Sequence, residues 1–511
     1  MSGIRVYGRT IFSCLLLCNV AFLIHCRTTG GGGNLQGLGA DWTSFGGSDA
    51  NNRHVTAGKI NSTNVGQLRV KFKVGDKASA SNPVVENKVI YWTDYAGTVH
   101  ATDESGRELW RKRFPNVEIT ASVAIDGNAL YFGDAKAVLR RLDKTTGNLV
   151  WEKDLESHPH GYIWGSPKIV DNILVIGVGA DGSRSKNVSL DYDRVMKGLR
   201  GSVRGIDKNT GNELWKWDAT GNMLDGIQTS DGNAVWSTCA IDRELGECYI
   251  GIGNAWLKNR ANNLNRPVDD GGKFISRYND GFVALNIRNG NIIWHHTNSP
   301  LDAWKGADGS IGKQADSDTG AAPNLFELDG VKVVGVADKA GMYTVVARVD
   351  GRIRGRNYSK GQVVWVKKII HNNKSVLGGF ISSAAYANGR LYMAGNDFIG
   401  ASKMYCVDAA DGREIWAVRN GGGFTIAAPV ISGDLVFSGD ASGEVKAYRT
   451  SNGSVAWTAN LPNGRGSDFT ISGGMLLSGT GFHFFDATGP VGLVVNEPPA
   501  GGLQAWALPQ N

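Results

Sequence analysis

One short pattern occurs seven times and restricts the fold more than any other feature of the chain. In each copy a glycine in a polar, Asp- or Asn-rich segment stands four residues before a tryptophan, as in DKTTGNLVW and DKNTGNELW. Glycine supplies the positive φ that a tight turn between antiparallel strands requires. A tryptophan at one height on the strand after each turn can pack into a neighbouring unit. The seven tryptophans are Trp110, Trp151, Trp215, Trp294, Trp365, Trp416 and Trp457.

Two further apolar, alternating segments precede each of these turns, such as PVVENKVIYWTD and SVAIDGNALYFGD. Each unit therefore reads as a four-stranded antiparallel meander of about 40 residues, which is the size of a propeller blade. Seventy glycines against thirteen prolines suit many short strands joined by tight turns. The sequence predicts an all-β protein, a β-propeller. A sandwich is the alternative, but the regular blade-sized period favours the propeller.

The two ends of the chain predict how the ring closes. The segment GQLRVKFK resembles an outer strand with Phe72 at the tryptophan position, and the stretch from Phe469 to Ala507 lacks an outer strand of its own. Pairing the N-terminal strand into the last blade would remove an exposed sheet edge. We therefore predict eight blades, with seven as the alternative. The longest steps between tryptophans place insertions at about residues 181–200, 255–280 and 299–318, where a site is expected.

The N-terminus predicts export. Arg5 and Arg9 precede an apolar run that has the length of a signal peptide and is too short to span a bilayer comfortably. We expect a signal peptide over residues 1–26, a flexible glycine-rich leader over 27–41 and a single propeller over 42–511. The protein would be secreted and extracellular, or periplasmic in a bacterium, with no membrane span. The net charge of +6 is spread thinly, so no nucleic-acid surface is expected.

The cysteines leave two interpretations open. Cys239 and Cys248 flank a predicted hairpin turn, so they could form a disulfide or be two small buried apolar residues. The chain has no Cys-x-x-Cys-His, so no covalently attached c-type haem is expected, and an oxidoreductase built on it would need an external electron acceptor. Five Asn-x-Ser/Thr sequons, beginning at Asn61, would be glycosylated only in a eukaryotic secretory pathway.

The repeated Asp-x-x-Thr-Gly-x-x-x-Trp resembles the tryptophan-docking motif of quinoprotein alcohol dehydrogenases, which depend on pyrroloquinoline quinone (PQQ). The opening segment from Trp42 to Arg53, WTSFGGSDANNR, is similar to the N-terminal segment of that family, as is the stretch from Ile60 to Leu68. The layout is most similar to polyvinyl-alcohol-dehydrogenase-like members. The resemblance implies PQQ and Ca²⁺ as cofactors and a small or polymeric alcohol as substrate.

The resemblance also implies a set of site residues. Trp236 would stack on the flat quinone, with Trp164 as a second cofactor-binding aromatic. Lys339 would hydrogen-bond the quinone oxygens and stabilise the negative charge that develops on reduction. Asp318, in DSDTGAAP, would be the general base that takes the proton of the substrate hydroxyl. Taken singly, each could instead be a packing tryptophan or a solvated surface charge.

The implied calcium site is incomplete. Asn254 and Asp318 match two ligands of the family, whose oxygens suit Ca²⁺. The third ligand should be an acidic residue, but a rigid alignment places Gly182 there, and Asp181 lies one residue early. This departure supports an alternative function, a non-catalytic secreted propeller that serves as an extracellular-matrix or binding protein. A third alternative is a scaffold for assembling other proteins, but such a scaffold has no use for Asp318 and Lys339.

Overall fold

The protein is described by a computed structural model. It describes residues 41–56, 58–180, 199–220, 230–257, 277–299, 303–304, 317–371, 378–398, 401–481 and 500–509. The expected signal peptide (1–26) and nearly all of the expected leader (27–41) lie outside this part of the chain. The propeller belongs to one compact unit, Gly33–Asn511. No helix in the described part of the chain is long and apolar enough to cross a membrane.

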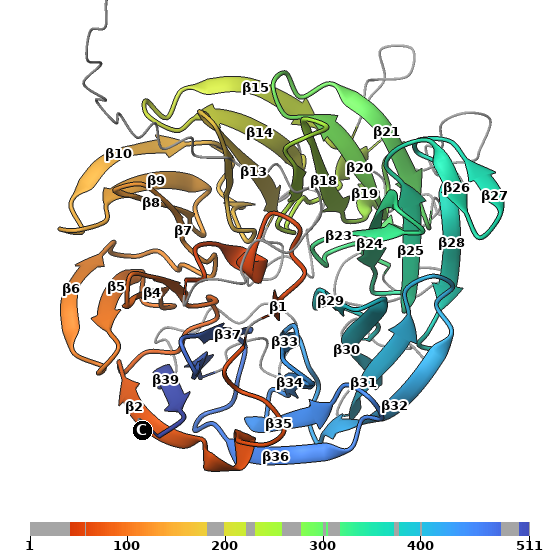
Figure 1. Cartoon of the computed structure of the whole chain (residues 1–511). Helices are drawn as coiled ribbons and strands as arrows, with labels where there is room; N and C mark the ends of the chain where they lie inside the picture. Colours follow the sequence, from red (N-terminus) through yellow and green to blue (C-terminus); the bar gives the residue numbers. More distant parts are fainter. Residues whose placement is uncertain are drawn as a thin grey trace, which may run out of the picture. The chain divides into compact units, whose positions relative to one another are not determined.

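Eight antiparallel sheets of four paired strands are arranged around an axis, which confirms the eight-bladed propeller (Figure 1). Within each blade the first strand lies nearest the axis and the fourth on the rim. From blade 1 to blade 8 the strands are β3(Val84–Glu86), β4(Val89–Thr93), β5(Thr98–Asp103), β6(Glu108–Arg113); β7(Ala124–Asp126), β8(Ala129–Gly133), β9(Val138–Asp143), β10(Leu149–Asp154); β12(Lys168–Val170), β13(Ile173–Ala180), β14(Ser202–Asp207), β15(Glu213–Asp218); β17(Ala240–Asp242), β18(Glu247–Ile252), β20(Gly281–Asn286), β21(Ile292–Thr297); β23(Asn324–Leu328), β24(Val331–Ala337), β25(Met342–Ala347), β28(Val363–Lys368); β29(Ala385–Ala387), β30(Arg390–Phe398), β31(Ala401–Asp408), β32(Glu414–Gly421); β33(Val430–Ser432), β34(Leu435–Gly439), β35(Glu444–Arg449), β36(Val455–Asn460); and β37(Phe469–Ser472), β38(Met475–Thr480), β39(Gly502–Ala507), β2(Arg69–Val74).

Seven strands and two short helices lie outside this plan or extend it. β11(Gly161–Tyr162) pairs with β13, and β1(His54–Val55) adds a parallel strand to β33. β16(Ser230–Gly232), β19(Ala255–Leu257) and β22(Ala303–Trp304) form a small separate sheet, and β26(Gly351–Ile353) pairs with β27(Arg356–Tyr358) as a hairpin. Two short 3₁₀ helices, η1(Phe45–Gly47) and η2(Val65–Gln67), precede the first blade.

The repeated glycine and tryptophan join neighbouring blades. All seven glycines have a positive φ, from +69° to +90°. A Cβ added at Gly147 would come within 2.5 Å of the ring of Trp110, which belongs to the preceding blade. The Trp110 indole N–H also donates to the carbonyl of Lys144, at 3.1 Å. The same packing joins Gly106 to Phe72, Gly211 to Trp151, Gly290 to Trp215, Gly361 to Trp294, Gly412 to Trp365 and Gly453 to Trp416.

A second repeat surrounds the axis at the start of each first strand. We call the eight residues at this position the axial ring: Asn82, Ser122, Ser166, Thr238, Ala322, Ser383, Ala428 and Asp468. The backbone N–H of a ring residue donates to the side-chain oxygen of the next one, at 2.6–3.2 Å, in six of the eight steps. At the other two steps the acceptor would be alanine, which has no side-chain oxygen. Because Asp468 donates to Asn82, the ring closes after eight blades.

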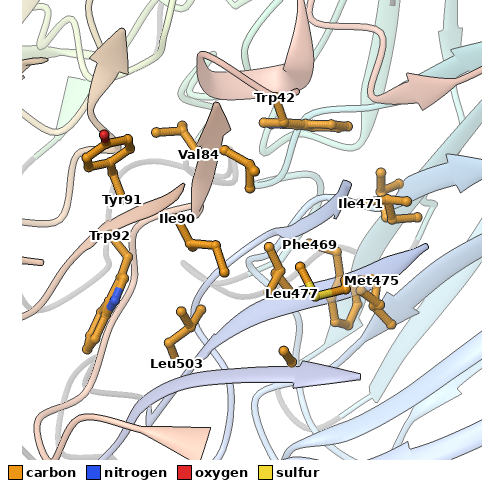
Figure 2. Close-up of a cluster of buried hydrophobic side chains, with 14 of the residues drawn as sticks. Trp42, Val84, Ile90, Tyr91, Trp92, Phe469, Ile471, Met475, Leu477 and Leu503 are labelled. Atoms are coloured by element: carbon orange, nitrogen blue, oxygen red, sulfur yellow. The ribbon is translucent and has the colours of Figure 1, made fainter. Parts of the chain in front are cut away.

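The two ends of the chain meet in the last blade. β2 pairs antiparallel with β39, from Arg69 opposite Ala507 to Val74 opposite Leu503, and so forms the rim strand of blade 8. Phe72 occupies the position that tryptophan has elsewhere. One apolar core contains Trp42, Val84 and Trp92 from the start of the chain together with Phe469 and Leu503 from its end (Figure 2).

The segment Trp42–Val55 runs around the axis along the first strands. Its carbonyls accept hydrogen bonds from Ile125, Ile241, Leu325, Tyr386 and Ile431 in turn, at 2.8–3.1 Å. Lys168 in blade 3 is buried and donates to the carbonyls of Phe45 and Ser48, at 2.7 and 2.6 Å. The N-terminal segment that resembles the family therefore lies at the centre of the propeller, bonded to the first strands of five blades.

Successive strands of a blade run in opposite directions. The connection that leads from one blade to the next and the turn from the second to the third strand therefore lie at the same end of the propeller. We call this end of the propeller the site end. The insertions expected near 181–200, 255–280 and 299–318 all fall in such connections, between β13 and β14, β18 and β20, and β21 and β23.

Cys239 and Cys248 form no disulfide. Both are free and buried, as expected for two small apolar residues.

Candidate functional site

Asp318 is held at the site end of blade 5, in the connection that leads to β23. Its Oδ1 accepts the backbone N–H of Asn254, at 2.6 Å, and its Oδ2 lies 3.2 Å from Nζ of Lys339. A Cβ at Gly253 would be only 2.5 Å from Oδ1, so glycine permits the close approach of the neighbouring chain. The carboxylate is 16% exposed and can therefore meet a ligand while its orientation is fixed.

Lys339 lies in the turn between β24 and β25, 21 residues after Asp318. Its backbone N–H donates to the carbonyl of Asp318, at 3.0 Å, and its ammonium forms an ion pair with the carboxylate. The Lys339 side chain is 12% exposed. Two contacts thus fix one residue against the other, and the structure brings together the two predicted catalytic residues.

Trp236 is half-buried in the connection that leads to blade 4. One part of its ring rests on Gly320, two residues after Asp318, where a Cβ would lie 1.7 Å from the indole. Glycine is the residue that leaves room for the ring at this point. Trp236 and Asp318, predicted separately from the sequence, therefore belong to adjacent connections in contact.

Trp164 occupies the equivalent place one blade earlier. Trp164 and Trp236 each stand two residues before an axial-ring residue, Ser166 and Thr238, which are joined by a hydrogen bond of 2.8 Å. Trp164 is half-buried, and its ring lies 4.7 Å from that of Tyr162 between centroids, at an interplanar angle of 34°. Both aromatic residues thus lie around the axis at the site end.

The predicted metal ligands are only partly described. Asn254 is buried, its backbone contacts Asp318 as above, and its carbonyl accepts the N–H of Asn233, at 2.9 Å. Asp181 lies outside the described residues. Among the described residues no group of three His, Cys, Asp or Glu side chains could hold a metal ion. The oxygens of Asn254 and Asp318 are nevertheless the hard donors that Ca²⁺ prefers.

A buried carboxyl beside Lys339 was not expected from the sequence. Asp338 is 1% exposed and accepts N–H bonds from Met342 and from the side chain of Asn298, both at 2.9 Å. Burial raises the pKa of Asp338 to about 7. The sequence contains a pattern that could have indicated this carboxyl. Asp338 begins an Asp-x-x-Gly segment, and Asp94, Asp134 and Asp440 begin Asp-x-x-Gly or Asp-x-x-Ala at the equivalent turn of other blades. In blades 1 and 2 the second carboxylate oxygen meets His100 or Arg140, whereas Asp338 meets a neutral amide.

The raised pKa of Asp338 predicts a pH-dependent stability. Between about pH 4 and pH 7 the folded protein retains a proton that the unfolded chain releases, so the free energy of unfolding falls as pH rises, by about 1.4 kcal/mol per unit. We expect urea unfolding to show a smaller difference between pH 5 and pH 8 for Asp338→Asn than for the wild type. An unchanged difference in the variant would show that Asp338 is ionised throughout.

Two family models match the chain. The PQQ model, which describes the β-propeller domain of glucose, ethanol and alcohol dehydrogenases, matches residues 162–353. The model of the outer membrane protein assembly factor BamB matches residues 55–189 and 400–489. The first match contains Trp164, Trp236, Asn254, Asp318 and Lys339.

Curated relatives point to the same group of proteins. The quinoprotein alcohol dehydrogenase PedH of Pseudomonas putida is 25% identical over 79% of this chain and 79% of its own length. The chain is related to the quinoprotein alcohol dehydrogenases. A quinoprotein ethanol dehydrogenase of Pseudomonas aeruginosa is 26% identical over 61% of this quinoprotein-like chain and 55% of its own length. The chain thus spans about half the length of several of these relatives.

Solved structures agree on the fold of this quinoprotein-like propeller. A quinohemoprotein alcohol dehydrogenase of Comamonas testosteroni superposes with a TM-score of 0.71 at 18% identity, covering 92% of this chain and 80% of its own. A europium-containing methanol dehydrogenase gives a TM-score of 0.70 at 17% identity, covering 92% and 98%. BamB of Moraxella catarrhalis gives 0.54 at 13% identity, covering 86% and 100%.

Proposed function

We propose that this chain is an exported, PQQ-dependent alcohol dehydrogenase that oxidises a small or polymeric alcohol and passes electrons to an external acceptor. The observation that carries the proposal is the oriented Asp318 carboxylate, which lies between the backbone N–H of Asn254 and the Lys339 ammonium, two residues before the Gly320 that the Trp236 indole contacts. The relatives favour this function over a matrix protein.

The residues fit a flat, anionic quinone. Trp236 offers a broad aromatic surface that Gly320 supports from one side. Lys339 places a fixed positive charge beside the Asp318 carboxylate in the adjacent connection. When bound, the quinone supplies the two-electron acceptor for the hydride that leaves the alcohol carbon. Trp164 would be a second aromatic contact around the same axis.

Asp318 would take the proton of the substrate hydroxyl at Oδ2 or at a free lone pair of Oδ1, because each carboxylate oxygen can accept more than one bond. The Asn254 N–H and the Lys339 ammonium hold this carboxylate in place. Asn254 and Asp318, with Asp181 as an acidic third ligand, would hold Ca²⁺.

The test uses the purified protein mixed with PQQ and Ca²⁺, an artificial electron-acceptor dye and a series of primary alcohols. We expect alcohol-dependent dye reduction by the wild type. Trp236→Ala is expected to weaken the binding of PQQ, so that more PQQ is needed for half-maximal dye reduction. The control is Trp457→Phe on the rim. Trp256 does not serve as a control because it lies in the small separate sheet. Folded wild-type protein that reduces no dye under these conditions would refute the proposed function.

A further inference from the structure

Arg465 is a buried cation that the proposed function does not use. It lies in the connection between β36 and β37 and is 1% exposed. Its Nε, Nη1 and Nη2 have no hydrogen-bond partner among the described residues. Its guanidinium stacks on the ring of Phe469, at 3.7 Å from the centroid. A guanidinium carries five N–H donors, and buried donors nearly always have a hydrogen-bond partner. We therefore expect an acceptor to bind at this group.

The nearby carboxylates are already occupied. Asp468 forms an ion pair with Arg53 and also accepts N–H bonds from Ala428, at 2.6 Å, and Asn82, at 2.9 Å. Arg53 is itself fully buried and stacks on Phe45 at 4.4 Å. The cluster thus holds two buried guanidinium groups, of which only that of Arg53 is paired with the Asp468 carboxylate.

Asp440, the other carboxylate near Arg465, is held by its own turn. Its Oδ1 accepts from the backbone of Ser442 and Glu444 and from the Ser442 hydroxyl, and its Oδ2 accepts the N–H of Gly423, at 2.6 Å. Burial lowers the pKa of Arg465 to about 9 although Asp468 and Asp440 act against this. Neither carboxylate accepts a hydrogen bond from Arg465.

The axial ring places Arg465 at the site end, the same end of the propeller as the candidate site residues. It precedes its ring residue, Asp468, by three positions. Trp164 and Trp236 precede theirs by two positions, and Asp318 precedes Ala322 by four. All four residues therefore lie in blade-to-blade connections on the same side of the ring. Gly439 leaves one side of Arg465 without a side chain, since a Cβ there would lie 2.9 Å from Nη1.

We propose that Arg465, backed by Arg53, is a carboxylate-binding subsite of the central site. A guanidinium binds a carboxylate through two parallel hydrogen bonds, and an anion would supply the acceptors and the charge that the cluster lacks. The carboxylate belongs either to the quinone, which carries three of them, or to an acidic small molecule at the same place. The first source rests on the proposed function, whereas the second does not.

The experiment measures binding to the full mature chain by titration calorimetry and by the shift in melting temperature. The ligands are PQQ with Ca²⁺ and, separately, malonate, with sodium chloride at equal ionic strength as the salt control. The variants are Arg465→Gln and, as the matched control, Arg113→Gln, an exposed rim arginine. Arg465→Met is the second variant if the glutamine variant does not fold.

We expect Arg465→Gln to weaken binding of at least one ligand 10-fold or more, and Arg113→Gln to change it less than twofold. A loss confined to PQQ assigns the subsite to the cofactor. A loss confined to malonate, with no PQQ binding by the wild type, refutes the proposed function but supports the subsite. Without ligand, Arg465→Gln should melt no lower than the wild type, because an unpaired buried charge has been removed.

Two results would overturn the subsite. The first is that the folded Arg465 variants bind both ligands as the wild type does. The second is that neither ligand binds the wild type.

Discussion

Asp318→Asn is expected to lower PQQ-dependent alcohol oxidation by about 10²- to 10⁴-fold, the range of a lost general base. Asparagine keeps the shape of the side chain and can still accept the Asn254 N–H through its oxygen. It cannot take a proton, and it removes the charge that pairs with Lys339. The change should therefore appear in kcat at saturating alcohol.

The control for this prediction is Asp76→Asn, which removes an exposed carboxylate outside the site. Activity is measured by dye reduction, and folding by circular dichroism. Wild-type kcat in a folded Asp318→Asn protein would show that another group takes the proton.

Gly147→Ala should destabilise the propeller by about 1–3 kcal/mol more than Gly127→Ala. Both glycines have a positive φ, +72° and +56°, so both substitutions carry the same kind of backbone strain. An added Cβ at Gly127 meets no atom within 4 Å, whereas one at Gly147 would lie 2.5 Å from the Trp110 ring. Only Gly147→Ala forces the indole out of its place between blades, and overpacking of this kind costs about 1–3 kcal/mol.

Urea unfolding of the two variants measures this difference directly. If Gly147→Ala is no less stable than Gly127→Ala, the contact between glycine and tryptophan contributes nothing to blade packing.

The fold could be predicted because its main contacts repeat. Six of the seven tryptophans meet a glycine one blade later, so a single local pattern, read seven times, specifies the whole ring. Phe72 was identifiable by the same logic. It lies near the start of the chain, in the strand that completes the last blade, and it occupies the tryptophan position there. The axial ring was harder to predict, because six of its members have only a small polar side chain in common and the other two are alanine.

The candidate site could be predicted only where a residue lies in a recognisable segment. Asp318 and Lys339 were found in this way, and they lie 3.2 Å apart. Asp338 and Arg465 were missed because burial determines their properties, and burial depends on distant parts of the chain. Asp338 meets Asn298, which follows β21 of the preceding blade, and the cluster around Arg465 joins Arg53 to Asp468, at opposite ends of the sequence.

The most direct test is an equilibrium titration of PQQ, in the presence of Ca²⁺, into the folded chain while tryptophan fluorescence is recorded. We predict saturable binding of about one quinone per chain, with quenching that is largely lost in Trp236→Ala, because this indole is the proposed stacking surface and rests on Gly320, two residues after Asp318. A folded wild-type protein whose fluorescence does not respond to PQQ, or whose response is the same in Trp236→Ala, would contradict the account.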